Sequence, residues 1–269
     1  MKSPNDRENL QSLDLYNQGL RKVPASVWQN QNLSMLNLAD NGLTSISEEI
    51  GNLVSLTMLD LGHNKLASLP DSLGKLTKLK FLYLSNNKLS SVPQPLWGLN
   101  TLLYLNITDN RLASLPEEMG RLSNLIELRL YNNQLSSLPD SIGQLSNLRE
   151  LHVMRNQLIS LPESIGQLKN LRKLVLEGNR IESLPESIGH LKSLTDLDLR
   201  NNQVRKLPNS IGKLKQLRFL DLRANQLADL PASIAKLQNL EKLDLRWNKS
   251  LALPKWISKL EERGSVVYW

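Results

Sequence analysis

The chain repeats itself every 23 residues. Stepping by 23 from Leu10 reaches a leucine in all eleven units, the last at Leu240. Within each unit, positions 1, 4, 6, 11, 14, 18 and 21 are apolar, and only Asn30 and Ser250 break this rule. A fixed period of this length is typical of a solenoid, in which each unit buries its apolar side chains against its neighbours.

Each unit begins with the pattern of a short, one-sided strand. Positions 4 and 6 are two residues apart and therefore share one face, while positions 3, 5 and 7 point the other way. Position 9 is asparagine in ten of eleven units, for example Asn64 and Asn87, and Gln18 is the exception. Since a buried asparagine amide can bond backbone groups of adjacent turns, we expect a stacked asparagine column at the bend.

The second part of each unit is marked by proline at position 15, in ten of eleven units, and often by a following Ile-Gly pair. Proline fits the first turn of a helix and glycine its exit, which predicts one short helical or 3₁₀ turn per unit. Ser47 replaces the proline in the second unit, where we expect a looser turn.

The repeat LxxLxLxxNxLxxLPxxIGxLxx over residues 10–262 resembles the 23-residue intracellular class of leucine-rich repeats. Ras-group and Scribble-type proteins and bacterial leucine-rich repeat proteins carry similar units. The resemblance implies an α/β repeat solenoid, a horseshoe or arc with a concave parallel β-sheet and short helical or 3₁₀ turns on the convex side. It also implies a protein-binding role without a fixed set of catalytic residues.

The two ends depart from the repeat. Residues 1–9 predict only a short N-terminal cap. Residues 263–269 predict a C-terminal closing strand, with Val266 at position 4 and Tyr268 at position 6.

Cysteine is absent from the chain, which excludes disulfides and thiolate metal sites and favours a reducing compartment. The N-terminus shows no apolar leader, and no apolar run approaches the roughly 18 residues that span a bilayer. We therefore expect a cytoplasmic protein with no membrane partner, with export by a non-classical route as the alternative.

One candidate partner-binding surface is an apolar stripe at position 3 of units two to five. Exposed apolar runs often mark contact sites, although strand-favouring side chains can also simply tile a sheet. The stripe contains Met35, Met58, Phe81 and Tyr104, with Tyr83 beside it at position 5 and Tyr131 and Met154 extending it at position 7.

A second candidate surface is an acid and base ladder in the last three units. Aspartates occupy position 5 and arginines position 7, flanked by Phe219 and Trp247. The ladder is either a polar docking face or a solvated pattern copied by repeat duplication, because exposed ion pairs contribute only ~0 to 1 kcal/mol. Its members are Asp198 and Arg200, Asp221 and Arg223, and Asp244 and Arg246.

The net charge of +7 raises the question of a nucleic-acid partner. Positions 3, 5, 7 and 8, assigned to the open face, hold eleven acidic and seven basic residues, a net charge of −4. This distribution predicts no nucleic acid in the concavity.

No pattern in the chain predicts catalysis, a cofactor or a metal site. Among the three histidines, only His152 has acidic neighbours by stacking, Glu127 and Glu150, which is weak for zinc. The favoured function is a non-catalytic scaffold that binds a protein or peptide on its concave face, as a monomer. The alternatives are a bacterial effector-type protein that engages host proteins and a protein that self-assembles, for example as a dimer through its edge strands.

Overall fold

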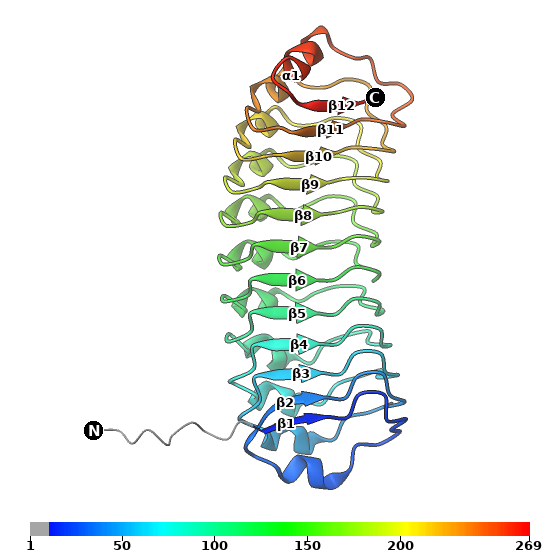
Figure 1. Ribbon diagram of the computed structural model, residues 1–269, viewed down its shortest axis with the longest axis vertical. Coiled ribbons are helices and arrows are strands. Elements are labelled where there is room, and N and C mark those ends of the chain that lie inside the picture. Colours follow the sequence, from blue (N-terminus) through cyan, green and yellow to red (C-terminus); the bar gives the residue numbers. More distant parts are fainter. Residues whose placement is uncertain (1–10) are drawn as a thin grey trace, which may run out of the picture.

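The protein forms one twelve-stranded parallel sheet in a computed structural model that describes residues 11–269 (Figure 1). Each strand pairs with the next in chain order, and equivalent residues of successive units lie side by side, as Met58 does with Phe81. The strands are β1 (Gln11–Asp14), β2 (Leu33–Asn37), β3 (Met58–Asp60), β4 (Phe81–Tyr83), β5 (Tyr104–Asn106), β6 (Glu127–Arg129), β7 (Glu150–His152), β8 (Lys173–Val175), β9 (Asp196–Asp198), β10 (Phe219–Asp221), β11 (Lys242–Asp244) and β12 (Val266–Tyr268).

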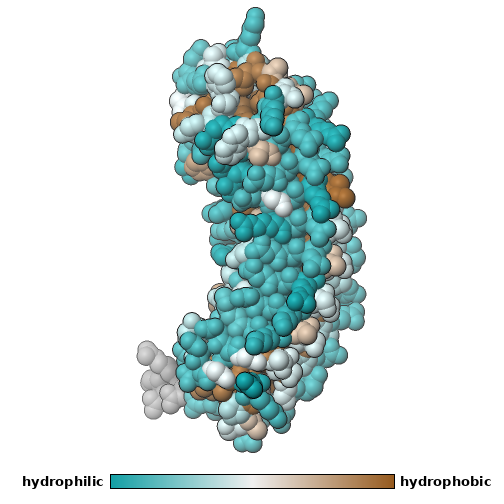
Figure 2. All heavy atoms as spheres, turned by 90° about the vertical axis from the view of Figure 1, so that its right-hand side faces the viewer, coloured by the Kyte–Doolittle hydropathy of each residue, from teal (hydrophilic) through white to brown (hydrophobic). Residues whose placement is uncertain are grey.

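Short 3₁₀ turns run along the side of the molecule opposite the sheet, and seen from the side the molecule is an arc (Figure 2). The predicted solenoid is confirmed. The turns are η1 (Ala25–Gln29), η2 (Glu48–Asn52), η3 (Asp71–Lys75), η4 (Gln94–Gly98), η5 (Glu117–Arg121), η6 (Asp140–Gln144), η7 (Glu163–Gln167), η8 (Glu186–His190), η9 (Asn209–Lys213), η10 (Ala232–Lys236) and η11 (Lys255–Ile257), followed by the helix α1 (Ser258–Glu261). Within the described residues, no helix has the length and apolar content to cross a membrane.

The apolar repeat positions form one continuous core between the sheet and the turns. Leu151 and Leu174, at position 4, are fully buried, as are their counterparts in most units. In the first unit Leu13 and Leu15 are only partly buried, because a single neighbouring unit covers them in the part of the chain described. The cap predicted for residues 1–9, together with Leu10, lies outside the described residues.

The asparagine column at position 9 forms as predicted. Asn133 Nδ2 donates to the carbonyl oxygens of Ile107 (2.9 Å) and Leu130 (3.1 Å), and its Oδ1 accepts from the amide of Leu112 (2.9 Å). Each asparagine thus bonds backbone groups of its own unit and of the preceding one, so the column holds successive bends together.

The 3₁₀ turns differ from the prediction in two respects. The turn after Ser47 is as regular as the others, because the Ser47 hydroxyl accepts a hydrogen bond from the Glu49 amide and caps the turn. The glycine of the Ile-Gly pair lies inside the turn and does not end it. A Cβ at Gly189 would lie 2.5 Å from the Ser210 carbonyl oxygen, so this glycine is required by the close approach of the next turn.

The closing strand forms, but its predicted register is wrong by one residue. Val266 pairs with Lys242, which is at position 3, and Tyr268 pairs with Asp244, which is at position 5. The last unit ends in the additional helix α1, so Val266 follows Lys242 by 24 residues instead of 23. Val267, the residue between them, therefore packs against the core, while Val266 and Tyr268 remain exposed.

Position 8, which we assigned to the open face as a free choice, is constrained by the backbone. In every unit it has a left-handed conformation, with φ from 51° at Asn17 to 69° at Gly178. Asparagine, aspartate and glycine tolerate this conformation best, which explains their frequency at position 8. The variable side chains of the concave sheet are therefore those at positions 3, 5 and 7.

Candidate functional site

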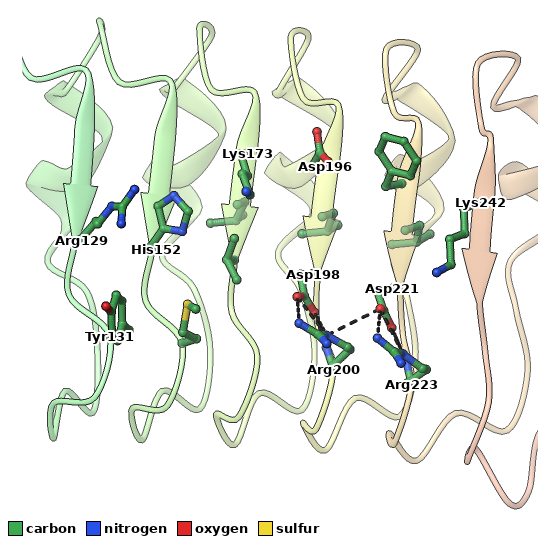
Figure 3. A pocket seen from close by; sticks show the side chains of 16 residues that line it. Arg129, Tyr131, His152, Lys173, Asp196, Asp198, Arg200, Asp221, Arg223 and Lys242 are labelled. Carbon is green, nitrogen blue, oxygen red and sulfur yellow. Dashed lines mark hydrogen bonds and ion pairs between the residues drawn. The ribbon is translucent and has the colours of Figure 1, made fainter. Parts of the chain in front are cut away.

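A hollow of about 650 Å³ lies on the concave side of the sheet and is lined by residues of β6 to β11 and the segments that follow these strands (Figure 3). Because the sheet is parallel and in register, position 3, position 5 and position 7 each form a column that crosses the strands. Side chains of all three columns contribute to the hollow.

The apolar part of the hollow is centred on Val175. This residue is at position 5 of β8, where the next three strands carry aspartate, and it is almost fully buried. Met154, Tyr131 and Phe219 also line the hollow and are partly buried. These four side chains supply apolar groups to the lining beside the acid and base ladder.

The ladder residues lie within a continuous network of hydrogen bonds. Arg200 donates from Nε to Asp198 Oδ1 (2.9 Å) and from Nη2 to Asp198 Oδ2 (2.7 Å), and Arg223 binds Asp221 in the same way, at the same two distances. Arg200 Nη2 also donates to Glu177 Oε2 (2.9 Å). Hydrogen bonding to Asp198 and the surrounding carboxylates raise the pKa of Arg200 above its usual value, so this guanidinium stays charged.

The network also crosses between strands. Arg200 Nε lies 3.6 Å from Asp221 Oδ2 (Figure 3), and Arg223 Nε lies 3.4 Å from Asp244 Oδ2. Asp244, at the C-terminal end, is fully buried and accepts a 2.7 Å bond from Arg246. The ladder is therefore more than a set of solvated surface pairs, since at least one of its carboxylates is removed from water.

The environment of Asp244 lowers the pKa of its carboxyl group. Burial alone raises this pKa, but the hydrogen bonds from Arg246 and the charges of Arg223 and Arg246 outweigh burial. The carboxylate form is thus favoured in the folded protein.

The C-terminal end of the network is covered by aromatic rings. The Arg246 guanidinium carbon lies 4.9 Å from the ring centre of Tyr268 and 5.6 Å from that of Trp247. Lys242 Nζ lies 5.2 Å from the same Tyr268 ring. The closing strand thus places Tyr268 over the last ion pair, that of Asp244 and Arg246. Tyr268 lies beside Asp244 at position 5 because of the register shift.

Two lysines of the hollow are less firmly paired than its arginines. Among the residues that the structure describes, no carboxylate forms an ion pair with Lys173. Lys242 Nζ lies 3.8 Å from Asp244, a carboxylate that Arg246 and Arg223 already approach more closely. Arg129, by contrast, donates to Glu127 and lies 5.7 Å from the Tyr104 ring centre.

The two surfaces predicted from the sequence lie in different parts of the sheet. Met35, Met58, Phe81 and Tyr104 are neighbours in register, and Tyr83 packs against Tyr104 with ring centres 4.9 Å apart. All five lie outside the hollow. The predicted residues that line it are Tyr131, Met154, Asp198, Arg200, Phe219, Asp221 and Arg223, whereas Asp244, Arg246 and Trp247 lie beyond it.

Several lining residues were not among the predicted site residues, notably Arg129, His152, Lys173 and Val175. A usable signal was present in the position 5 column, which changes from histidine to valine to aspartate over β7, β8 and β9. A break of this kind in a repeated column marks a place where the repeat is not simply copied.

Glu127, Glu150 and His152 come close together, with one potential ligand atom from each within 4.8 Å of the others. These atoms already have partners in the protein. Glu127 accepts from Arg129, and His152 Nε2 lies 3.0 Å from Glu150 Oε2. The cluster therefore supplies no argument for a metal site.

Comparisons with known proteins agree with this architecture. The family described as "Leucine rich repeat" matches residues 8–66 and 55–112, and that described as "Leucine-rich repeat region" matches residues 88–176 and 162–220. No curated protein matched the sequence.

Solved structures with the same fold come from plants and bacteria. The plant peptide hormone receptor RGFR1, solved in complex with RGF2, is 30% identical with a TM-score of 0.82, and the match covers 97% of this chain and 47% of the receptor chain. The ectodomain of the Arabidopsis thaliana receptor kinase GASSHO1/SCHENGEN3, in complex with CASPARIAN STRIP INTEGRITY FACTOR 2, is 29% identical with a TM-score of 0.62, covering 92% and 37%. An internalin from Listeria monocytogenes shares the fold at 23% identity and a TM-score of 0.59, covering 97% and 87%.

This chain thus spans less than half the length of the two plant receptor chains. The family matches together extend from residue 8 to residue 220, and the repeat, the parallel sheet and the asparagine column continue to the last unit. The chain belongs to the leucine-rich repeat family.

Proposed function

We propose that the protein is a non-catalytic binding module that holds an extended segment of a protein partner in the concave hollow over β6 to β11. The hollow itself carries this proposal. Its volume of about 650 Å³ and its combination of an apolar centre with a few fixed polar groups are typical of ligand-binding sites.

The ion-pair network supports binding because it fixes the side chains that a partner would meet. Arg200 and Arg223 are each held by two short bonds to an aspartate before any partner arrives. Binding to fixed side chains avoids part of the entropy that ordering long side chains costs, about 0.5 to 1.5 kcal/mol for each. This consideration favours the docking interpretation of the ladder over decoration.

The complexes of similar proteins are consistent with this role. RGFR1 was solved with RGF2 and GASSHO1/SCHENGEN3 with CASPARIAN STRIP INTEGRITY FACTOR 2, on chains with the same repeat fold. For the present chain, the stripe from Met35 to Tyr104 is a second contact surface on the same sheet. A partner that occupies the hollow and continues toward β2 would meet both.

The same proposal excludes nucleic acid from the concavity. Positions 3, 5 and 7 hold nine acidic and six basic residues over the eleven units, so a phosphate backbone would meet net repulsion along the sheet.

We further propose a cytoplasmic location, which rests on the absence of cysteine. Cell fractionation followed by immunoblotting tests the location, and recovery in the extracellular fraction would contradict it.

A selection experiment tests the binding site. A random peptide library is panned on the protein, and selected peptides are then measured against two matched variants, Val175→Asp in the hollow and Asn106→Asp three strands away at the same position. Both substitutions introduce the residue that other units carry at position 5, so both variants should fold.

We expect Val175→Asp to weaken binding tenfold or more, because a charged group replaces the apolar centre, and Asn106→Asp to leave it unchanged. Equal affinity for both variants would reject the hollow. If the double variant Phe81→Ser/Tyr104→Ser loses binding while Val175→Asp keeps it, the binding site is the stripe instead.

The exposed side chains of β12 favour self-association as a second candidate function. Val266, Tyr268 and Trp269 are 50%, 42% and 71% exposed, and within residues 11–269 β12 pairs with β11 alone. Exposed edges of this kind can pair with another chain. Light scattering over a range of concentrations tests this candidate, and a constant monomer mass would remove it.

A further inference from the structure

The strongest feature that the proposed function leaves unexplained is the position of the two weakly paired lysines. Lys173, Asp196, Phe219 and Lys242 follow one another in the position 3 column, on β8, β9, β10 and β11 (Figure 3). Three strand spacings of ~4.8 Å separate the first lysine from the last, a distance of ~14 Å. Lys242 therefore stands at the β11 end of the hollow, and Lys173 stands near its middle, on β8.

The carboxylates between and beside these lysines are held by other groups of the protein. Asp196 Oδ2 accepts a 2.6 Å bond from the Thr195 hydroxyl, a neutral donor that does not offset a carboxylate charge, while Asp198 and Asp221 are bound by Arg200 and Arg223. The arginines thus have little charge left to offer a partner. The ammonium groups of Lys173 and Lys242 are therefore the charges that a partner can match, with two separate negative groups ~14 Å apart.

We propose that the hollow selects an acidic segment of a partner protein, extended across the strands, with acidic side chains at residues i and i+4 and an apolar side chain at i+2. This inference rests on the proposed function and specifies the partner. An extended chain rises ~3.3 to 3.4 Å per residue, so residues i and i+4 lie ~13 to 14 Å apart and, with i+2, on the same face. The acids meet Lys173 and Lys242, and the side chain at i+2 falls between Asp196 and Phe219, beside the Phe219 ring.

A continuous polyanion fits the same surface poorly. Between the two lysines it would place negative charges against Asp196, Asp198 and Asp221, all of which line the hollow. Two isolated acids avoid these contacts. The arrangement therefore favours an acidic protein segment over a nucleic acid.

Fluorescence anisotropy with defined peptides tests the spacing. The probe is the labelled peptide Gly-Ser-Glu-Ser-Leu-Ser-Glu-Ser-Gly, and its control has the same composition with adjacent acids, Gly-Ser-Glu-Glu-Leu-Ser-Ser-Ser-Gly. We expect the spaced peptide to bind about two- to tenfold more tightly, since each partly exposed ion pair contributes modestly, and we expect the difference to shrink as salt is raised.

Charge reversal identifies the lysines. Lys173→Glu should weaken binding of the spaced peptide and restore binding of a peptide with lysine at one acidic position. Lys213→Glu, on the convex turn η9, makes the same change in net charge and should have no effect.

Absence of binding by the spaced peptide, equal binding of the two peptides, or equal effects of the two reversals would overturn the inference. Tighter binding of a single-stranded oligonucleotide that is lost in Lys173→Glu would overturn it in favour of a nucleic acid. If library peptides lose binding in Val175→Asp but carry no acidic pair, the proposed function stands and only this inference fails.

Discussion

At the scale of single residues, the side chain that contributes most to the fold after the leucines is the asparagine at position 9. Asn133 satisfies two carbonyls and one amide that are buried in the bends of two units. An apolar replacement removes these bonds. The Leu112 amide is then left without a partner, which costs about 1 to 3 kcal/mol, whereas the Ile107 and Leu130 carbonyls still accept from Asn110 and Asn156.

We therefore predict that Asn133→Ala lowers the free energy of unfolding by about 1 to 3 kcal/mol. Asn170→Ala is the control, because its exposed amide makes a single bond, to the Ser146 carbonyl, and we expect it to cost less than about 1 kcal/mol. Urea denaturation followed by circular dichroism measures both. Similar losses would show that the column does not hold the bends.

The depressed pKa of Asp244 leads to a prediction about acid stability. A carboxyl group with a folded pKa below its usual value of 3.8 contributes stability that is complete above that value and is lost as the pH falls through the folded pKa. The wild-type protein should therefore lose stability below about pH 4 more steeply than Asp244→Asn.

Unfolding free energies measured between pH 2 and pH 7 test this expectation. Asp229→Asn, a substitution at an exposed aspartate, should leave the wild-type slope in place. If the unfolding free energies of the wild type and of Asp244→Asn change with pH in the same way, the lowered pKa of Asp244 is contradicted.

At the scale of elements, the close packing of successive 3₁₀ turns depends on glycine. The Gly189 position has a carbonyl oxygen within 2.5 Å of where a Cβ would lie, whereas nothing lies within 4 Å of the same point at Gly98. Trp28 and Trp97 occupy in their units the repeat position that Gly189 occupies in its own. A groove of about 330 Å³ lies beside Trp97. Glycine at this position therefore coincides with a close approach of the next turn, as at Gly189.

Gly189→Ala should destabilise the protein by about 1 to 3 kcal/mol, because the methyl group forces two packed turns apart. Gly98→Ala should be neutral or stabilise the protein by up to about 1 kcal/mol, through the lower entropy of the unfolded chain. The midpoints of urea denaturation distinguish the two variants. A destabilisation of equal size in both would point to backbone conformation as the cause instead of packing.

The features of this structure that could be predicted are those that the repeat determines. The buried leucines and the bend at Asn133 follow from the repeat, and the parallel sheet follows from its resemblance to leucine-rich repeats. The register of β12 does not, because α1 adds one residue after the last repeat that no pattern announces. The hollow around Val175 also escapes prediction, since it depends on how Arg200 and Arg223 fold back onto their aspartates.

At the scale of the whole molecule, the arc carries two different surfaces on one sheet. The N-terminal strands present an apolar stripe from Met35 to Tyr104, and the C-terminal strands present the hollow and its fixed ion pairs. A single extended partner can contact both, because equivalent positions stack without interruption from β2 to β11. The central claim is that the hollow is where such a partner is held.

Photo-crosslinking tests this claim most directly. A library-selected peptide that carries benzoylphenylalanine at its central residue is bound, irradiated and mapped by mass spectrometry. The account predicts crosslinks on the concave residues of β7 to β10, above all Met154, Val175 and Phe219. Crosslinks confined to the convex 3₁₀ turns, or to the stripe from Met35 to Tyr104, would contradict it.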